Sequence, residues 1–484
     1  MDQHRKHFYS LLGIICLGII MRALFLNHQA LWYDEMAQAS VASADWKDLF
    51  LLVTRHTSPP LDYVLTKLVM LLFGNADWVI RMPAFLFGVA SIYVFYLLAR
   101  ALTDRENGLL ATALLALSPM AISYSQEARM YSLFLFLSLT SYLLTLFFIE
   151  RNDLKTSVRL GIINGLLILS HYFGIFVVAG EGFILLLVLL SHGGRKRRAA
   201  FMAGALLISG VMFLPWLPYF VTQLDYTGAE AGYALRANRY FFSSILSSFT
   251  TGAGQHRVRV YAYVFMFVLG AAWAWRNREK KVITVALSVA GTLGLLFGLT
   301  YYARVVTPRN VLFLLPLFLL VCAYGFYAII KRCRISYIPG TLIVVLLAVW
   351  PAAQAARSGG KINWRDAAVY LRQHGGGDEK VITTDFISRA CLAYYLDPEA
   401  DYVIMKERWR ETANDPGWKI WVLTDELLAA IEEQRFSGWV VIPPSAFLAV
   451  TEEQIDEYNA RMGRPVKQFK LFKRALNIYK VPPF

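Results

Sequence analysis

Residues 311–330 read VLFLLPLFLLVCAYGFYAII, twenty consecutive residues without a charged side chain. A helix of about 20 apolar residues is long enough to cross the ~30 Å hydrocarbon core of a bilayer. Similar runs recur through residues 1–352, and 57% of the 484 residues are hydrophobic against 17% that are charged. This composition excludes a soluble globular protein and predicts an α-helical polytopic membrane protein.

Apolar runs between polar breaks predict about eleven transmembrane helices. The run from Phe8 to Leu26 has no small-residue cleavage pattern after it, so we expect it to remain as the first span rather than to be removed as a signal peptide. The shorter run 59–74 carries Asp62 and Lys67, and each charge would cost about 2.5–3.5 kcal/mol at the centre of a span. We therefore expect 59–74 to form an interfacial helix. The predicted spans lie near residues 8–26, 81–102, 108–126, 130–150, 159–173, 174–191, 200–221, 259–275, 282–301, 311–330 and 335–352.

The distribution of basic residues orients these spans. With 59–74 in the interface, six basic clusters fall on one side of the membrane, which the positive-inside rule makes the cytoplasmic side. The N-terminus is then cytoplasmic, and residues 27–80 form the first outer loop. The clusters are Arg5/Lys6, Arg100/Arg105, Arg151/Lys155/Arg159, Arg195–Arg198, Arg276/Arg278/Lys280/Lys281 and Lys331/Arg332/Arg334.

The net charge of +14 comes entirely from the membrane part of the chain. Residues 353–484 hold 18 basic and 18 acidic residues, whereas residues 1–352 hold 30 basic and 16 acidic residues. The excess therefore reflects membrane topology, and we expect no nucleic-acid partner. The four cysteines show no pairing or metal-ligand spacing, so we expect no disulfide framework.

Residues 353–484 predict a small extracytoplasmic α/β domain after the transmembrane domain of residues 1–352. Helical patterns alternate with β-rich runs, and no glycine-rich phosphate loop or paired metal ligands occur. A scaffold or lid over the outer mouth is one interpretation of this domain, and acceptor binding is another. The predicted helices are Trp364–His374 and Asp425–Arg435, and the predicted strands are Val381–Thr384, Ile420–Leu423, Trp439–Ile442 and Asn477–Val481.

Two adjacent carboxylates, Asp34 and Glu35, follow Leu31-Trp-Tyr directly after the first span. An acidic pair in this position is also typical of a solvated helix start, because carboxylates favour the first turn of a helix. The functional interpretation is a general base near the membrane surface that removes a proton from a hydroxyl group.

The same face collects basic residues that could bind an anion. Each could instead place its charge among the lipid headgroups. Arg304 and Arg309 bracket a short turn ahead of the helix that starts near Val311, and two guanidinium groups with a helix N-terminus can hold a phosphate. Glu181 lies inside an apolar run, where it either serves function or bonds to a neighbouring helix. The outer basic residues are Arg55, His56, Arg81, Arg129, His171, Arg304 and Arg309.

The order of several motifs resembles the bacterial GT-C membrane glycosyltransferases, relatives of protein O-mannosyltransferases and of lipid A aminoarabinose transferases. The resemblance is strongest over residues 28–135, continues through the turns at Ser170–Phe173 and Thr307–Asn310, and fades in the tail. It implies an enzyme of the bacterial plasma membrane that uses a polyprenyl-phosphate sugar on the outer face and no nucleotide sugar. The motifs are Leu31-Trp-Tyr-Asp-Glu35, the SPPLDY segment 58–63, Arg81-Met-Pro83, Ser118-Pro119 and the YSQEARMY segment 124–131.

The resemblance also implies roles for single residues. Asp34 matches the catalytic carboxylate, with Glu35 beside it. Asn310 stands where the family has a tyrosine, and His56 lies two residues earlier than the histidine often placed before Pro-Pro. The implied donor-phosphate ligands are Arg81, Arg129, Arg304 and Arg309, and the implied substrate-binding residues are His56, Tyr63, Tyr131 and His171.

The predicted reaction is an inverting transfer of a hexosyl or pentosyl group to a hydroxyl of an extracytoplasmic acceptor, which is a cell-envelope glycan, a lipid or a protein. A divalent ion could bridge carboxylates and phosphate, although the sequence shows no dedicated metal site. One alternative is a transporter or flippase of lipid-linked saccharides, which should carry charges near the midplane of several spans or two related halves. Another is an oligosaccharide ligase or polymerase of the same architecture.

Overall fold

In a computed structural model, the chain folds into two compact units. The helical unit comprises Met1–Leu26, Val53–Val69 and Arg81–Ser358, and the α/β unit comprises Asn27–Leu52, Met70–Ile80 and Gly359–Phe484. The structure describes residues 2–24, 26–191, 195–226, 234–251, 257–303, 305–333, 349, 353, 362–375, 380–383, 386–396, 419–422, 438–443, 452–462, 464–471 and 474–481.

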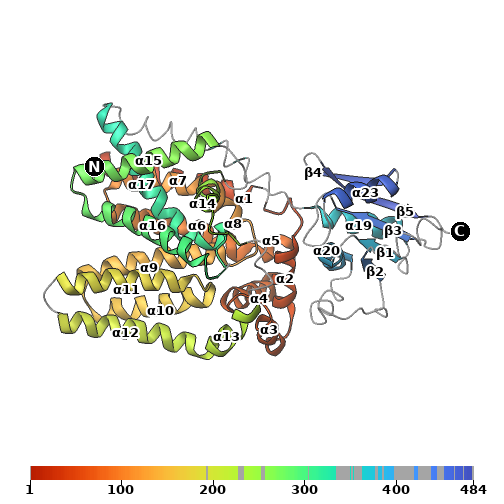
Figure 1. Cartoon of the computed structure of the whole chain (residues 1–484), viewed down its shortest axis with the longest axis horizontal. Coiled ribbons are helices and arrows are strands. Elements are labelled where there is room, and N and C mark those ends of the chain that lie inside the picture. Colours follow the sequence, from red (N-terminus) through yellow and green to blue (C-terminus); the bar gives the residue numbers. More distant parts are fainter. Residues whose placement is uncertain are drawn as a thin grey trace. The chain divides into compact units, whose positions relative to one another are not determined.

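The helical unit contains many long apolar helices (Figure 1). α4 begins in this unit, and its last residues, from Met70 on, belong to the α/β unit. The helices are α1 (Asp2–Ala23), α4 (Leu61–Phe73), α6 (Met82–Leu102), α7 (Arg105–Ala116), α8 (Pro119–Ser125), α9 (Tyr131–Arg151), α10 (Leu154–Ser170), α11 (Gly174–Ser191), α12 (Arg195–Phe213), η1 (Leu214–Trp216), α13 (Leu217–Tyr226), α14 (Phe241–Thr251), α15 (Arg257–Arg276), α16 (Lys280–Leu299), η2 (Pro308–Leu314) and α17 (Leu315–Arg332).

Several of these helices are suited to cross a membrane, and the chain is an integral membrane protein. Among the described residues, seven helices are long and apolar enough to span, or eight if the bent pair α7 and α8 is one span. Helices occur in each of the first ten predicted spans. α10 and α11, however, are not among the helices that are long and apolar enough to span. The predicted span 335–352 lies almost wholly outside the described residues. The run 59–74 forms α4, whose 13 residues are too few for a full span.

The predicted span 108–126 is broken, because α7 and α8 meet at a bend of 58°. Pro119 has no N–H to donate to the carbonyl of Leu115, so the last carbonyls of α7 need other donors. The buried Arg22 of α1 supplies them: Nη1 donates to Ala116 O at 2.8 Å and Nη2 to Leu115 O at 3.5 Å. Arg22 Nε also donates to Ser125 Oγ at 3.1 Å, so one side chain ties α1 to both halves of the bend.

Glycines allow two pairs of helices in the helical unit to approach closely. A Cβ atom at Gly270 of α15 would collide with the carbonyl of Val321, and one at Gly325 of α17 would collide with the carbonyl of Met266. A Cβ atom at Gly88 of α6 would likewise strike Ser125 of α8. Such small residues are typical of helix contacts within membranes, where close packing rather than the hydrophobic effect joins helices.

The α/β unit combines first-loop helices with a five-stranded sheet. The strand order is β2-β1-β3-β5-β4, in which β1 pairs in parallel with β2 and β3, while β5 pairs antiparallel with β3 and β4 (Figure 1). The elements are α2 (Tyr33–Ser43), α3 (Trp46–Val53), α5 (Asp77–Ile80), α19 (Trp364–His374), β1 (Lys380–Thr383), α20 (Phe386–Leu396), β2 (Lys419–Val422), β3 (Gly438–Ile442), α23 (Glu452–Met462), β4 (Lys467–Leu471) and β5 (Arg474–Val481).

Most of the predicted tail elements occur in the structure. The helix Trp364–His374 and all four predicted strands are confirmed within one to three residues, whereas the predicted helix Asp425–Arg435 lies outside the described residues. The sequence analysis missed three elements, which are α20, α23 and β4. The strand β4, which reads KQFKL, has three polar residues among five and lies at the edge of the sheet, where charged residues such as lysine are typical.

Candidate functional site

The predicted carboxylates Asp34 and Glu35 lie in the first turn of α2, in the α/β unit. Trp32 before them is extended, and Glu35 Oε2 accepts a hydrogen bond from Trp32 N at 3.3 Å. This is the glutamate half of a capping box, which satisfies a helix-start N–H group. Glu35 is fully buried and Asp34 is only partly buried. The pair therefore divides into a buried residue that orders the helix start and a neighbour that is only partly buried.

The YSQEARMY segment holds the end of the helical bundle together. Gln126 Nε2 donates to the carbonyls of Met21, Arg22 and Leu24 at 3.3, 3.1 and 2.6 Å. These carbonyls belong to the last turn of α1, where no further helical N–H groups are available. Gln126 thus fixes the end of α1 to the turn that leads to Arg129.

A cluster of polar and aromatic residues forms around His171, in the turn between α10 and α11. We call Arg129, Tyr131, His171, Arg309 and Asn310 the basic cluster. Arg309 Cζ lies 5.7 Å from the centroid of the Tyr131 ring, which in turn lies 5.9 Å from the His171 ring. These residues come from three separate turns of the helical unit, before α9, after α10 and in η2.

His171 is held as a neutral imidazole. Burial lowers the pKa of His171 to about 3, and the nearby charges of Arg309 and Arg129 act in the same direction. Its Nδ1 accepts a hydrogen bond from Phe173 N at 3.1 Å, so the proton of the neutral ring resides on Nε2. The ring stacks on Phe134 with centroids 4.6 Å apart.

Asn310, which stands where the family has a tyrosine, forms hydrogen bonds with both the backbone and His171. Its Nδ2 donates to Val305 O at 2.9 Å, and its side chain also forms a hydrogen bond with His171. Asn310 thereby ties the imidazole to the segment that leads into η2. A buried hydroxyl, Thr307 Oγ1, lies in the same segment and has no hydrogen-bond partner among the described residues.

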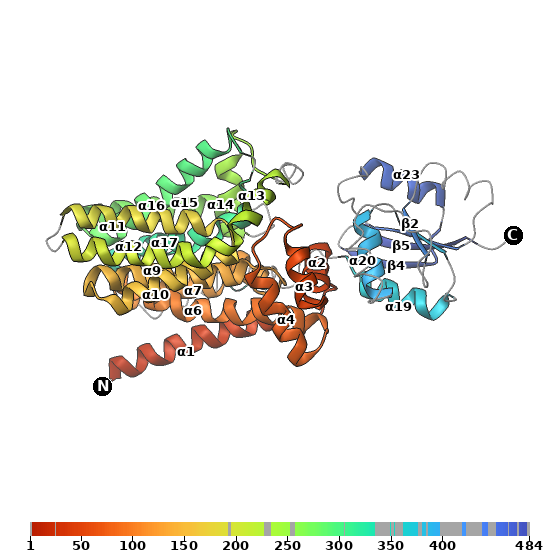
Figure 2. The same ribbon diagram turned by 90° about the horizontal axis from the view of Figure 1, so that it is seen from below.

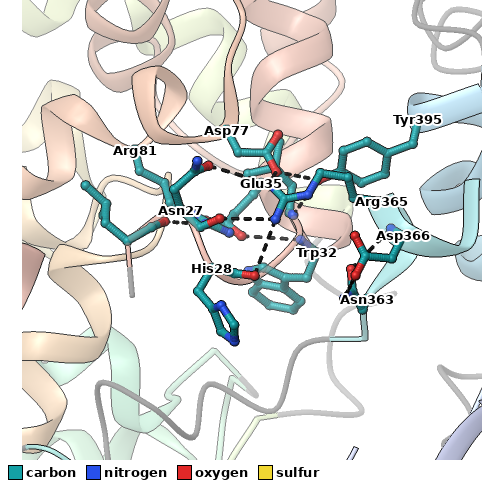
Figure 3. Close-up of polar contacts among 12 residues, drawn as sticks. Asn27, His28, Trp32, Glu35, Asp77, Arg81, Asn363, Arg365, Asp366 and Tyr395 are labelled. Carbon is teal, nitrogen blue, oxygen red and sulfur yellow. Dashed lines mark hydrogen bonds and ion pairs between the residues drawn. The ribbon is translucent and has the colours of Figure 1, made fainter. Parts of the chain in front are cut away.

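The remaining predicted site residues are Arg81, His56, Tyr63 and Arg304, which are not part of the basic cluster. Arg81 is buried, and its Nη1 donates to Leu26 O at 2.7 Å, just after α1 (Figure 3). His56 lies beside Tyr63, with ring centroids 5.9 Å apart, and Tyr63 is buried. Arg304 lies outside the described residues.

Comparison with known proteins gives a consistent result. Residues 57–219 match the dolichyl-phosphate-mannose-protein mannosyltransferase family model. ArnT from Cupriavidus metallidurans bound to undecaprenyl phosphate superimposes with a TM-score of 0.60 over 98% of both chains, at 12% identity. The oligosaccharyltransferase AglB from Archaeoglobus fulgidus, in complex with an inhibitory peptide and a dolichol-phosphate, superimposes with a TM-score of 0.54 over 91% of this chain and 70% of AglB, at 11% identity. The chain has the GT-C fold.

A relative by sequence points to the same superfamily. YkcB of Bacillus subtilis (strain 168), to which a mannosyltransferase activity is provisionally ascribed, is 20% identical over 266 residues. The match covers 50% of this chain and 36% of YkcB, so the chain spans about a third of that relative. Together with the partial family match, these findings make the chain similar to membrane glycosyltransferases of the GT-C superfamily.

One residue of the GT-C helical unit was missed as a site residue. Asp62, in the SPPLDY segment that suggested Tyr63, is buried in the first turn of α4. Burial raises the pKa of the Asp62 carboxyl to about 7, while the charge of Arg129 opposes this shift. A buried acid beside an arginine of the basic cluster is a candidate functional group. The available signal was the position of Asp62 two residues after Pro-Pro, which precedes the start of a helix.

The candidate residues thus form two groups. Asp62 and the basic cluster belong to the helical unit, and Asp34 and Glu35 belong to the α/β unit. Within the described parts of the chain, no group of three or more His, Cys, Asp or Glu residues could hold a metal ion.

Proposed function

We propose that the protein transfers a sugar from a polyprenyl-phosphate donor to a hydroxyl of an extracytoplasmic acceptor, with inversion at the anomeric carbon. The observation that carries this proposal is the basic cluster, in which Arg129 and Arg309 both act on the buried, neutral His171. Two guanidinium groups near one buried point favour an anion of matching geometry, such as a phosphate.

Two groups near the arginines, Asp62 and His171, carry less than a full negative or positive charge at neutral pH. Asp62 has a pKa of about 7, so at neutral pH its carboxyl is only partly ionised and only partly compensates Arg129. His171 is neutral and can donate from Nε2 without adding charge. The hydroxyl of Thr307 offers a further hydrogen bond near Arg309. These features support a phosphodiester as the occupant of the basic cluster.

The solved relatives support a lipid carrier for this phosphate. The ArnT structure contains undecaprenyl phosphate, and the AglB structure contains a dolichol-phosphate. A lipid tail could remain in the bilayer beside the apolar helices while its phosphate enters the basic cluster. We extend this arrangement to the present chain as part of the proposal.

In the proposed reaction, Asp34 accepts the proton of the acceptor hydroxyl as that oxygen forms a bond to the anomeric carbon. The bond between the anomeric carbon and the phosphate oxygen breaks, and its electron pair stays on the phosphate. Arg129 and Arg309 stabilise the additional negative charge that develops on this leaving group. Glu35 keeps α2 in register through its bond to Trp32 N, and no separate general acid is required.

We further propose that the enzyme lies in a bacterial plasma membrane with its N-terminus in the cytoplasm. In this topology residues 353–484 are extracytoplasmic, as the basic clusters predict. The acceptor is then a glycan, lipid or protein of the cell envelope.

Mass spectrometry of lipids that copurify with the protein tests the donor class. We expect a polyprenyl phosphate or its monosaccharide in wild-type protein, and less of it in Arg309→Ala. Loss of a hydrogen bond to a charged group typically costs about 1.5–3 kcal/mol, so donor affinity should fall by about 10- to 100-fold. Arg309→Lys should restore only part of this loss if the guanidinium binds in a bidentate manner.

The exposed Arg236 provides a matched control, because Arg236→Ala removes the same charge from a residue outside the basic cluster. Equal donor affinity in wild type, Arg236→Ala and a folded Arg309→Ala would contradict the phosphate role of the basic cluster. An oligosaccharide on the copurified lipid would favour a ligase or polymerase over a monosaccharide transferase.

A further inference from the structure

We propose that Arg365 and Tyr395, from the C-terminal part of the chain, are positioning residues for the Asp34 helix. This inference deepens the proposed function and rests on the role of Asp34 in it. Both residues belong to the same compact unit as α2, although more than 300 residues separate them from it in the sequence. Through these contacts the C-terminal domain would order the segment that carries Asp34.

Arg365, in the first turn of α19, holds the segment that leads to α2. Its Nη2 donates to Asn27 O at 3.1 Å and to His28 O at 3.4 Å (Figure 3). Its Nη1 lies 3.2 Å from Asp77 Oδ2 and also donates to Asn27 Oδ1 at 3.5 Å. One guanidinium therefore joins two backbone carbonyls of the first loop to the carboxylate of α5, a geometry that a lysine cannot reproduce.

Tyr395, in the last turn of α20, also binds the segment that leads to α2. Its Oη donates to Asp77 Oδ2 at 2.9 Å and accepts from Leu31 N at 2.7 Å. Burial and the charge of Asp77 raise the pKa of the Tyr395 hydroxyl, so the group remains protonated and keeps donating. Asp77 is 8% exposed and is thus a buried acceptor shared by Arg365 and Tyr395.

These contacts fix the backbone directly ahead of the catalytic carboxylate. The carbonyls of Asn27 and His28 are bound by Arg365, Leu31 N by Tyr395, and Trp32 N by Glu35. Four backbone groups within six residues are therefore held before α2 begins. A displacement of a catalytic group by about 1 Å can cost about 10²-fold in rate, so the register of this segment bears directly on turnover.

The test uses variants that keep the packing and remove only the polar contact. Tyr395→Phe deletes the hydroxyl, and Arg365→Lys keeps the charge but loses the fork of donors. The controls are Tyr370→Phe, which deletes a hydroxyl elsewhere in the C-terminal domain, and Arg372→Lys, which changes an exposed arginine of the same helix. Each variant is compared in single-turnover transfer, in donor occupancy, and in hydrogen exchange of residues 27–35.

We expect Tyr395→Phe and Arg365→Lys to slow single-turnover transfer by about tenfold while donor affinity stays within about twofold of wild type. The amides of residues 27–35 should exchange faster in both variants and unchanged in both controls. Asp77→Asn should give a similar defect, and its combination with Tyr395→Phe should be less than additive, because both changes disrupt one contact.

The outcomes separate this inference from the proposed function. Normal exchange of residues 27–35 and a normal transfer rate in both variants would overturn the positioning role while leaving the proposed function intact. A wild-type protein that transfers no sugar would refute the proposed function, and the exchange measurement would still report whether Arg365 and Tyr395 order the segment.

Discussion

At the scale of single residues, the basic cluster is governed by the competition between burial and charge. Burial favours the neutral forms of Asp62 and His171, whereas Arg129 and Arg309 remain charged. His171 does not change its protonation state near neutral pH, because its pKa is about 3. Asp62, with a pKa of about 7, is therefore the group expected to make the cluster sensitive to pH.

We predict that donor binding weakens as the pH rises from 6 to 8. Over this range Asp62 ionises and its negative charge next to Arg129 competes with the donor phosphate. Asp62→Asn should bind the donor with an affinity that is nearly independent of pH and, at pH 8, several-fold higher than that of wild type. Donor titrations at pH 6, 7 and 8 check this, and an identical pH profile in wild type and Asp62→Asn would refute it.

The same pKa shift affects stability with a defined sign. The pKa of Asp62 is about 7 in the folded protein, against an ordinary value of 3.8 for an aspartate, so the folded state binds the proton more tightly. This contribution is complete below pH about 4 and is lost as the pH rises to about 7. We therefore expect the Tm of wild type to fall relative to that of Asp62→Asn between pH 4 and 7, as differential scanning calorimetry in detergent can measure. Parallel Tm curves would contradict the assigned protonation.

Residue types and motif order predicted part of this site. The turns that carry Arg129, His171 and Arg309 were recognisable because basic residues at outer span ends need an anionic partner or the headgroups. Asp62 was missed because its environment depends on burial by other helices, which a local pattern does not reveal. The contacts of Arg365 and Tyr395 were equally inaccessible, since they join segments more than 300 residues apart.

At the scale of elements, a buried polar cluster joins three helices of the bundle. Ser141 of α9 donates to Glu181 of α11 with Oγ–Oε distances of 2.8 and 2.9 Å, and Asn164 Nδ2 of α10 donates to Glu181 at 3.1 Å. Ser141 also contacts Asn164 Oδ1. α9, α10 and α11 lie side by side in both views of the molecule (Figures 1 and 2). Of the two interpretations of Glu181, these contacts favour the bond to neighbouring helices.

We predict that Glu181→Gln preserves this interhelical contact and that Glu181→Leu disrupts it. Glutamine keeps the size and a side-chain acceptor, while leucine removes the acceptor of Asn164 Nδ2 and leaves Ser141 only its contact with Asn164 Oδ1. Interhelical hydrogen bonds in membranes contribute about 0.6 kcal/mol on average and up to about 2 kcal/mol, so Glu181→Leu should lower the midpoint of unfolding in detergent. A donor affinity that falls in Glu181→Gln at unchanged stability would instead indicate a functional role.

The elements themselves were largely predictable, and the exceptions have local causes. Apolar runs identify helices because a bilayer leaves no other partner for the backbone. The break between α7 and α8 was missed because a continuous apolar run hides the missing N–H of Pro119, and Arg22 supplies the compensating donors from another helix. In the tail, β4 was missed because three of its five residues, Lys467, Gln468 and Lys470, are polar and lower its apparent β character.

At the scale of the whole molecule, the protein is an integral membrane protein with the GT-C fold, and its orientation is a prediction. The basic clusters favour a cytoplasmic N-terminus and an extracytoplasmic C-terminal domain. A reporter fused after Phe484 should be active only if it functions outside the cytoplasm. Activity of a cytoplasmic reporter at Phe484 would contradict the topology and would place the proposed site on the wrong side of the membrane.

The central claim is that Asp34 is the general base of a sugar transfer from a polyprenyl phosphate. Single-turnover transfer by Asp34→Asn tests it most directly when donor occupancy is measured in the same preparation, so that lost binding is not mistaken for lost chemistry. Asp45→Asn, at an exposed aspartate of the same loop, serves as the control. We predict that Asp34→Asn binds donor normally and transfers about 10²- to 10⁴-fold more slowly than wild type, while Asp45→Asn transfers at the wild-type rate. Transfer by Asp34→Asn at the wild-type rate with full donor occupancy would contradict this account.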